Sequence, residues 1–134
     1  MPKRFSRAAL VKRFPRAAGR KLVEEFSLGE PEIQDVVFEA GGTIPRRAET
    51  VRRRLQEFFG AGDGFWTITR LNFTDGVRIT FDNGDVAHFR PSGNADELRI
   101  YAVAGTQERA DQIAEMAVKE PDGILRRIER GTAG

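Results

Sequence analysis

The segment VRITFDNGDVAHFRPSGNADELRIYAVA, residues 77–104, decides the fold, because three strand patterns follow one another in it. Apolar and polar side chains alternate over 77–81, as they do in strands that bury one face. In a strand over 86–90, His88 shares one side with Val86 and Arg90, and in a strand from Leu98 the residues Leu98, Ile100 and Ala102 face one way and Arg99 and Tyr101 the other. An Asn-Gly pair at 83–84 separates the first two runs and is a strong short-range signal for a tight hairpin. The segment therefore predicts consecutive antiparallel strands.

Further strands are expected before this segment. Residues 66–73 predict a strand that leads into it, which gives a sheet of four strands. The run from Ile33 to Phe38 is β-branched and apolar, and we interpret it as a strand as well. A short helix after Pro31 is the alternative for this run.

Helical spacing of apolar side chains predicts three helices and a final helical turn. The first covers Arg16–Phe26, and the second begins at Pro45 and stops at Gly60. Thr106 is expected to cap the third, and residues 121–123 break it before the last turn. Together these elements predict an α+β fold of two layers, in which a four-stranded, mainly antiparallel sheet has its helices packed on one face.

The composition is that of one folded domain. The chain has 134 residues, of which 40% are hydrophobic, and a chain of this length buries roughly two-thirds of the surface that it exposes when unfolded. No apolar run approaches the ~20 residues that a transmembrane helix needs. The chain has no cysteine, which fits a reducing compartment. We therefore expect a cytoplasmic protein that does not enter a membrane.

Positive charge is concentrated at the start of the chain, where residues 1–21 contain Lys and Arg but no Asp or Glu. We interpret residues 1–30 as a basic linker with the first helix, and residues 31–134 as the folded domain. The alternative is a basic arm that contacts nucleic acid or an acidic protein, with a group of arginines in the second predicted helix extending the patch. These are Arg46, Arg47, Arg52, Arg53 and Arg54. Nucleic acid is the less favoured partner, because domains that bind it normally carry a dominant basic field.

The loop between the last two predicted strands contains a candidate anion site. Arg90 ends one strand and Arg99 lies in the next, and each guanidinium can donate two charge-assisted hydrogen bonds to a phosphate. Ser92 and Asn94 add short donors. Gly93 is expected to give the backbone a positive φ and to let a ligand approach the amides. The alternative is an ordinary hairpin loop whose arginines are solvated.

His88 is the single histidine of the chain and lies on the same side of its strand as Arg90. We interpret it as a partly exposed strand residue, with a minor role in hydrogen bonding a ligand as the alternative. One histidine and no cysteine provide too few ligands for a zinc site, and a Ser-His-Asp triad could only be built on His88.

The order of these motifs resembles the C-terminal domain of the phosphohexomutases, the family of phosphomannomutase and phosphoglucomutase. Members of that family have a T-D-G-V-R strand, an R-P-S-G-(T/N) loop and an L-R-x-Y strand. This chain has TDGVRIT at 74–80, RPSGN at 90–94 and LRIYAVA at 98–104. The strong part of the likeness covers about residues 74–119, and it implies a TATA-binding-protein-like arrangement of sheet and helices.

The resemblance also implies a function. In these enzymes the C-terminal domain clamps the phosphate that does not react while a hexose phosphate undergoes intramolecular phosphoryl transfer. The implied phosphate-binding residues are Arg90, Ser92, Gly93 and Asn94, with Arg99 as a supporting donor. The implied partners are mannose or glucose 1- or 6-phosphate and the other domains of the mutase.

The chain departs from the family pattern at the loop and lacks the catalytic strings of the family. Asn94 stands where Thr is common, which keeps a donor. Asp96 stands where Pro is common, and it is expected to loosen the loop and to weaken binding by its charge. The phosphorylated serine of the family lies in a T-A-S-H-N type loop and its Mg²⁺ in a D-G-D-G-D-R type loop, and neither string occurs here. We therefore expect no cofactor in this chain, Mg²⁺ in the missing catalytic domains, and no mutase reaction by the chain alone.

Overall fold

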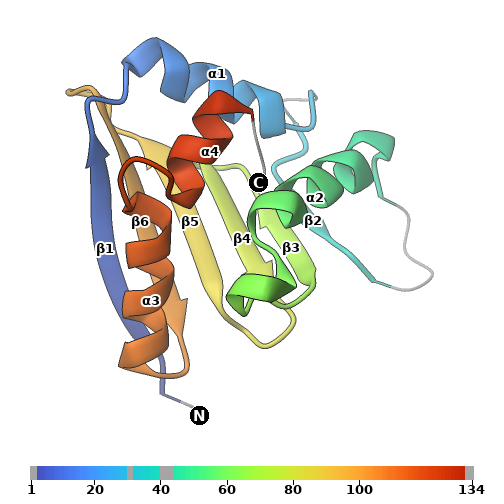
Figure 1. Cartoon of the computed structure of the whole chain (residues 1–134). Helices are drawn as coiled ribbons and strands as arrows, with labels where there is room; N and C mark the ends of the chain where they lie inside the picture. Colours follow the sequence, from blue (N-terminus) through green and yellow to red (C-terminus); the bar gives the residue numbers. More distant parts are fainter. Residues whose placement is uncertain (1–2, 30–31, 40–43, 132–134) are drawn as a thin grey trace.

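The computed structural model describes residues 3–29, 32–39 and 44–131, which form a six-stranded sheet and four α-helices (Figure 1). In chain order the elements are β1 Phe5–Lys12, α1 Arg16–Phe26, β2 Asp35–Val37, α2 Arg46–Phe58, the 3₁₀ turn η1 Ala61–Asp63, β3 Ile68–Asn72, β4 Val77–Phe81, β5 Val86–Pro91, β6 Glu97–Ala104, α3 Gln107–Val118 and α4 Ile124–Arg130.

The fold has two layers, one of strands and one of helices. The strands lie in the order β1-β6-β5-β4-β3-β2, and every neighbouring pair is antiparallel. The four α-helices cover one side of the sheet, the helical face, and among the described residues no helix covers the other side, the open face (Figure 1). Side chains of the open face include Arg70, Arg78, His88, Arg90, Arg99 and Tyr101. The predicted α+β class is confirmed.

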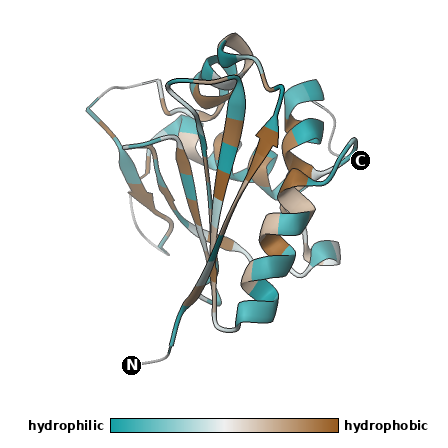
Figure 2. Cartoon of the chain, turned by 90° about the vertical axis from the view of Figure 1, so that its left-hand side faces the viewer, coloured by the Kyte–Doolittle hydropathy of each residue, from teal (hydrophilic) through white to brown (hydrophobic). Residues whose placement is uncertain are grey.

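Strand β6 shows how the sequence separates the two faces. Leu98, Ile100 and Ala102 are fully buried toward the helices, whereas Arg99 and Tyr101 are partly exposed. Figure 2 shows the same alternation of hydrophobic and hydrophilic residues along the strands, seen from the β1 side with α3 along one side of the sheet. The predicted alternation in this strand is confirmed, and it places Arg99 and Tyr101 on the open face.

The sheet has six strands and not the four expected. Residues 35–37, within the run interpreted as a strand, form the edge strand β2, so the short-helix alternative is wrong. The other edge strand, β1, lies inside the segment interpreted as a basic linker and pairs with β6 along its whole length. The proposed boundary at residues 30–31 lies outside the described residues.

Sequence analysis missed strand β1 because its apolar and polar residues do not alternate regularly between the two faces of the sheet. Arg7 lies opposite the buried Ala102 and therefore on the helical face, where its Nη1 is 3.6 Å from Asp111 Oδ1 of α3. Leu10 lies on the open face instead, opposite Arg99. A charged residue on the inner side and an apolar one on the outer side conceal the period of two.

The predicted helices agree closely with the structure. Helix α1 has the predicted bounds, and α2 begins after Pro45 and ends before Gly60. Thr106 caps α3, since its Oγ1 accepts a hydrogen bond from the Arg109 N–H (3.0 Å). None of the helices in the described part of the chain is long and apolar enough to cross a bilayer.

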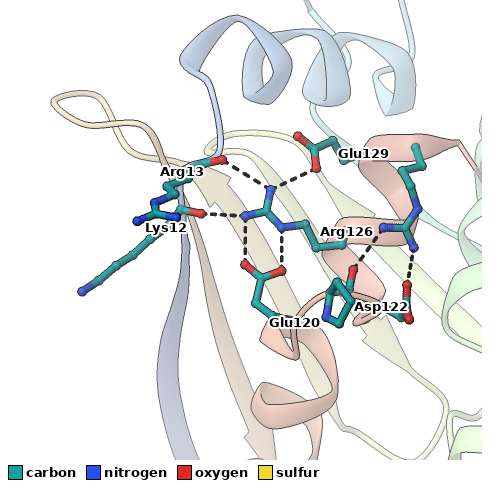
Figure 3. Close-up of polar contacts among 8 residues, drawn as sticks. Lys12, Arg13, Glu120, Asp122, Arg126 and Glu129 are labelled. Carbon is teal, nitrogen blue, oxygen red and sulfur yellow. Dashed lines mark hydrogen bonds and ion pairs between the residues drawn. The ribbon is translucent and has the colours of Figure 1, made fainter.

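Arg126 of α4 forms hydrogen bonds that link the end of β1 to the turn before α4 (Figure 3). Its guanidinium donates to the carbonyl oxygens of Lys12 (2.7 Å) and Arg13 (3.4 Å). It also donates to the carboxylates of Glu120 (2.8 Å) and Glu129 (3.0 Å). These partners, Glu120 most strongly, raise the pKa of Arg126 above its ordinary value. The connection from β1 to α1 is therefore held in one place.

Candidate functional site

Arg90 and Arg99 face each other across strands β5 and β6. They are directly opposite in the antiparallel register, so both side chains project from the open face. Both are partly exposed, with 35% of the Arg90 side chain and 42% of the Arg99 side chain accessible to solvent. The structure thus brings the two arginines together at one end of the sheet, as the sequence led us to expect.

Tyr101 lies beside both guanidinium groups. The Arg90 Cζ is 5.8 Å from the centre of the Tyr101 ring. Arg90, and after it Arg99, lowers the pKa of the Tyr101 phenol below its ordinary value. The main cause is side-chain hydrogen bonding between each guanidinium and the phenol, and groups that donate to a phenolate can also donate to other anions at the same place. Sequence analysis did not name Tyr101 as a site residue, although the alternation along β6 had placed it on the side of Arg99.

Two carboxylates stand near the arginines without pairing tightly. Asp75 Oδ2 is 3.6 Å from Arg90 Nε, and Glu97 Oε1 is 3.9 Å from Arg99 Nη2. Tyr101 first and Asp75 second raise the pKa of Arg90 above its ordinary value. Exposed ion pairs contribute about 0–1 kcal/mol, and these are longer than hydrogen bonds, so neither carboxylate holds a guanidinium tightly. The hydrogen-bond partner that both arginines share is Tyr101.

The β5–β6 loop, residues 92–96, leaves several of its backbone donors unused. The Ser92 N–H extends the ladder by donating to the Glu97 carbonyl (3.0 Å), and the Asn94 N–H donates weakly to Ser92 Oγ (3.4 Å). Three other N–H groups have no hydrogen-bond partner among the described residues, those of Gly93, Ala95 and Asp96. Unpaired N–H groups close together in one loop can bind an anion.

The expected positive φ at Gly93 is wrong. Gly93 is not among the described glycines that adopt one, and a Cβ placed on it would have no atom within 4 Å. Neither the backbone nor the packing therefore requires glycine at this position. The space above the loop is open, so a ligand would meet no side chain of Gly93 on its way to the amides.

The turn before β4 supports the site from the neighbouring strand. Gly76 has φ 76°, and a Cβ on it would lie 2.6 Å from the Cβ of Arg90, so only glycine allows this turn to lie so close to β5. Asp75, one residue earlier, places its carboxylate near Arg90. The T-D-G string, residues 74–76, was expected to form a turn as well as to carry part of the family resemblance, and the structure confirms the turn.

His88 lies on the open face, opposite Arg78 on one side and Tyr101 on the other. Its ring centre is 5.9 Å from that of Tyr101, and its Nε2 shares a short hydrogen bond with the Asp75 carbonyl oxygen. His88 thus links β5 to the turn before β4. Its minor role toward a ligand stays a prediction.

Asp96 does not loosen the loop, contrary to expectation. Its Oδ1 accepts a hydrogen bond from the Arg16 N–H at the start of α1 (3.2 Å). Its carbonyl oxygen accepts one from the Phe14 N–H (2.9 Å). Figure 1 shows the loop, at the upper left, next to the start of α1. Asp96 therefore ties the loop to the helix.

Arginines of α2 hold that helix against α1. Arg47 donates to the carbonyl oxygens of Ser27 (2.6 Å) and Glu25 (3.0 Å) at the end of α1. Arg54 donates to the Glu25 carboxylate (2.7 Å). These two members of the group that could extend a basic patch are thus engaged within the fold.

Comparisons with known proteins agree with this arrangement of motifs. The profile of the family described as "Phosphoglucomutase/phosphomannomutase, C-terminal domain" matches residues 6–120. The chain is 56% identical over 48 residues to a phosphomannomutase of Salmonella muenchen, which covers 36% of this chain and 10% of that protein. It is 49% identical over 39 residues to a phosphomannomutase of Sinorhizobium fredii, with 29% of this chain and 8% of that protein covered. A phosphopentomutase of Thermococcus kodakarensis is 30% identical over 87 residues, with coverage of 65% and 17%. The matched stretches thus make up less than a fifth of each relative.

Proposed function

Because the chain belongs to the family of phosphoglucomutase/phosphomannomutase C-terminal domains, we propose that it clamps the phosphate of a hexose phosphate that is not transferred. Arg90 and Arg99 supply the charge, and Ser92, Gly93 and Asn94 supply short donors at the end of the sheet. In the complete mutase the other domains carry out the intramolecular phosphoryl transfer while this domain holds the far end of the substrate.

One observation supports the proposal most directly. Two guanidinium groups lie directly opposite each other on the open face, and three N–H groups of the loop that joins their strands have no hydrogen-bond partner in the described part of the chain. A phosphate group offers several acceptor oxygens and close to two negative charges at neutral pH, so it can use both kinds of donor together. The lowered pKa of Tyr101 supports the same proposal, because its main causes are hydrogen bonds from Arg90 and Arg99, so both guanidinium groups can donate toward one acceptor.

The substrates that we propose are mannose or glucose 1- or 6-phosphate. A single clamp that is open to water uses only part of the contacts that a closed active site offers. We expect a dissociation constant on the order of millimolar for the chain alone, which corresponds to about −4 kcal/mol.

The residues of this chain do not fit the magnesium site that the family resemblance implies for the whole enzyme. Among the described residues, no three His, Asp or Glu side chains come close enough together to hold a metal ion. We therefore place the metal and the phosphorylated serine in other domains of the complete enzyme, and we assign to this chain binding and orientation of the substrate only.

The proposal is tested by titrating the ¹⁵N-labelled chain with glucose 6-phosphate, inorganic phosphate and glucose, followed by NMR. We expect the amides of residues 92–96 to shift with both phosphates and not with glucose. The Arg90→Ala variant should lose these shifts. Arg70→Ala, which removes another open-face arginine two strands away, should keep them.

Two results would overturn the proposal. One is that the Gly93 and Ala95 amides do not move at about 50 mM glucose 6-phosphate, well above the expected dissociation constant. The other is that Arg90→Ala and Arg70→Ala weaken binding equally, which would indicate a general attraction of anions to the open face.

A further inference from the structure

We propose that Asp96 is a positioning residue, which holds the β5–β6 loop in its phosphate-binding shape by capping helix α1. The inference rests on the proposed function, since it concerns how the same loop is kept ready. It concerns a position at which this chain departs from the family pattern, because Asp96 stands where proline is common.

Helix α1 has no cap of its own. Pro15 stands at the N-cap position without a side-chain hydrogen bond, and the first turn has no acidic residue. The first N–H groups of a helix need acceptors from outside, and a carboxylate there also interacts favourably with the helix dipole. Asp96 Oδ1 supplies this acceptor to the Arg16 N–H at 3.2 Å, from a loop 80 residues away in sequence.

The segment around α1 also holds the loop by its backbone and at its other end. The Asp96 carbonyl accepts the Phe14 N–H at 2.9 Å, so one residue makes two bonds to the start of α1. Before the loop, Pro91 lies against α1, because a Cβ on Gly19 would be only 3.0 Å from the Pro91 Cβ. The loop is therefore fixed to α1 on both sides of Gly93.

The anchor for Asp96 is itself held firmly. Phe14 is 1% exposed, and Arg126 binds the carbonyl oxygens of Lys12 and Arg13 immediately before it (Figure 3). A loop tied to such a segment has fewer conformations to lose when a ligand binds, which improves affinity.

The same contacts direct the charge of Asp96 away from the ligand. Its carboxylate is turned to the Arg16 backbone and lies 3.5 Å from the Arg16 Nε. The N–H groups of Gly93 and Ala95 meanwhile remain unpaired. The Asp96 carboxylate thus accepts the bond that fixes the loop, and the donors of the loop stay open.

Three variants separate the cap from the ion pair. Asp96→Ala removes both, Asp96→Asn keeps an acceptor oxygen for the Arg16 N–H without the charge, and Arg16→Ala removes the ion pair while keeping its own N–H. We measure the affinity of each folded variant for inorganic phosphate and glucose 6-phosphate by NMR. The order of the Gly93 and Ala95 amides is measured by ¹⁵N relaxation without ligand.

We expect Asp96→Ala to bind phosphate about fivefold more weakly, which is the effect of losing one capping bond. The Gly93 and Ala95 amides should become more mobile in this variant. Asp96→Asn and Arg16→Ala should stay within about twofold of the native chain, since both keep the capping bond. A helix cap without a role in the loop would change stability alone and leave the affinity of the folded protein unchanged.

Failure of this inference and failure of the proposed function give different results. If the native chain binds phosphate and Asp96→Ala binds it equally well, the positioning role is wrong and the clamp stands. If Asp96→Asn loses as much affinity as Asp96→Ala, the capping bond is not the cause and the inference is overturned. A native chain that binds neither phosphate nor glucose 6-phosphate overturns the clamp, and the positioning role with it.

Discussion

Strand β5 begins and ends at two turns that use their hydrogen-bonding groups in opposite ways. The β4–β5 turn closes on itself, with the Gly84 N–H donating to the Phe81 carbonyl (2.9 Å) and the Asp85 N–H to Asn83 Oδ1 (3.0 Å). In the β5–β6 loop, three N–H groups have no partner among the residues that the structure describes, and contacts with α1 hold the two ends of the loop. The β4–β5 turn thus satisfies its own hydrogen-bonding groups, whereas the β5–β6 loop has N–H donors that a ligand could use.

The glycines of the two turns are present for different reasons. Gly84 has φ 88°, a conformation that L residues rarely adopt, so the hairpin requires it. Gly93 has no positive φ and no neighbour that a Cβ would meet. Glycine in a turn can therefore be attributed to ligand binding only where the backbone conformation does not itself require it.

The first prediction concerns the self-contained turn. Gly84→Ala should lower the free energy of unfolding by about 1–2 kcal/mol, because a side chain is strained in the left-handed region. The nearest atoms to the new Cβ belong to the guanidinium of Arg4, the far end of a flexible side chain that can move away. Urea unfolding measures the loss, and phosphate affinity should stay as in the native chain. If the free energy of unfolding stays unchanged, the β4–β5 turn does not require glycine at position 84.

The second prediction concerns the open loop. Gly93→Ala should leave the free energy of unfolding unchanged or raise it by about 0.4–1 kcal/mol, because the unfolded chain loses freedom and the folded chain has room for the methyl group. Phosphate affinity should nevertheless fall about fivefold, or about 1 kcal/mol, since the methyl group obstructs approach to the amides. NMR titration and urea unfolding of the same variant test both parts. If Gly93→Ala lowers the free energy of unfolding but keeps full phosphate affinity, Gly93 serves the fold and not the ligand, and the proposed difference between the two turns is wrong.

Local sequence patterns were sufficient to predict the centre of the sheet. Strand β4 and helix α1 have the predicted bounds, and Thr106 caps α3 as expected. In each case the signal lies within a few neighbouring residues: a strict alternation, a helical stripe or one side chain next to the N–H groups that it caps. Such elements are specified locally, and tertiary contacts reinforce them.

The features that sequence analysis missed depend on contacts between distant segments. Strand β1 exists because β6 offers it a partner, and its acid-free composition had suggested a linker. The role of Asp96 depends on Arg16, 80 residues earlier. The opposed placement of Arg90 and Arg99 could be anticipated, because one short loop joins their strands. Whether the amides of that loop were already paired could be decided only from coordinates.

The third prediction uses Tyr101 as a reporter of charge at the loop end of β5. The chain has one tyrosine, so the ultraviolet absorbance of phenolate follows this residue alone. Since Arg90 is the main cause of its lowered pKa, Arg90→Ala should raise that pKa toward its ordinary value of 10.0, and saturating phosphate should raise it in the native chain. Arg70→Ala should leave it unchanged. If neither Arg90→Ala nor phosphate changes the pKa of Tyr101, Arg90 does not interact with the phenol and the anion does not bind at the loop end of β5.

The smallest effect is expected at Glu97. This residue lies in β6, the strand of Arg99, and its negative charge disfavours the binding of an anion there. Glu97 lies opposite Lys12 in the sheet, with its Oε1 3.9 Å from Arg99 Nη2. The Glu97 carboxylate repels an anion bound between the arginines. Glu97→Gln should therefore tighten phosphate binding by about twofold at low salt, which is the size of effect expected for an exposed charge. The gain should vanish at about 1 M salt, where the screening length falls to roughly 3 Å. Glu57→Gln, an exposed charge on α2, should have no effect at either salt concentration. Equal gains for both variants would mean that net charge alone attracts the ligand, whereas a gain confined to Glu97→Gln places the anion at the open loop of β5.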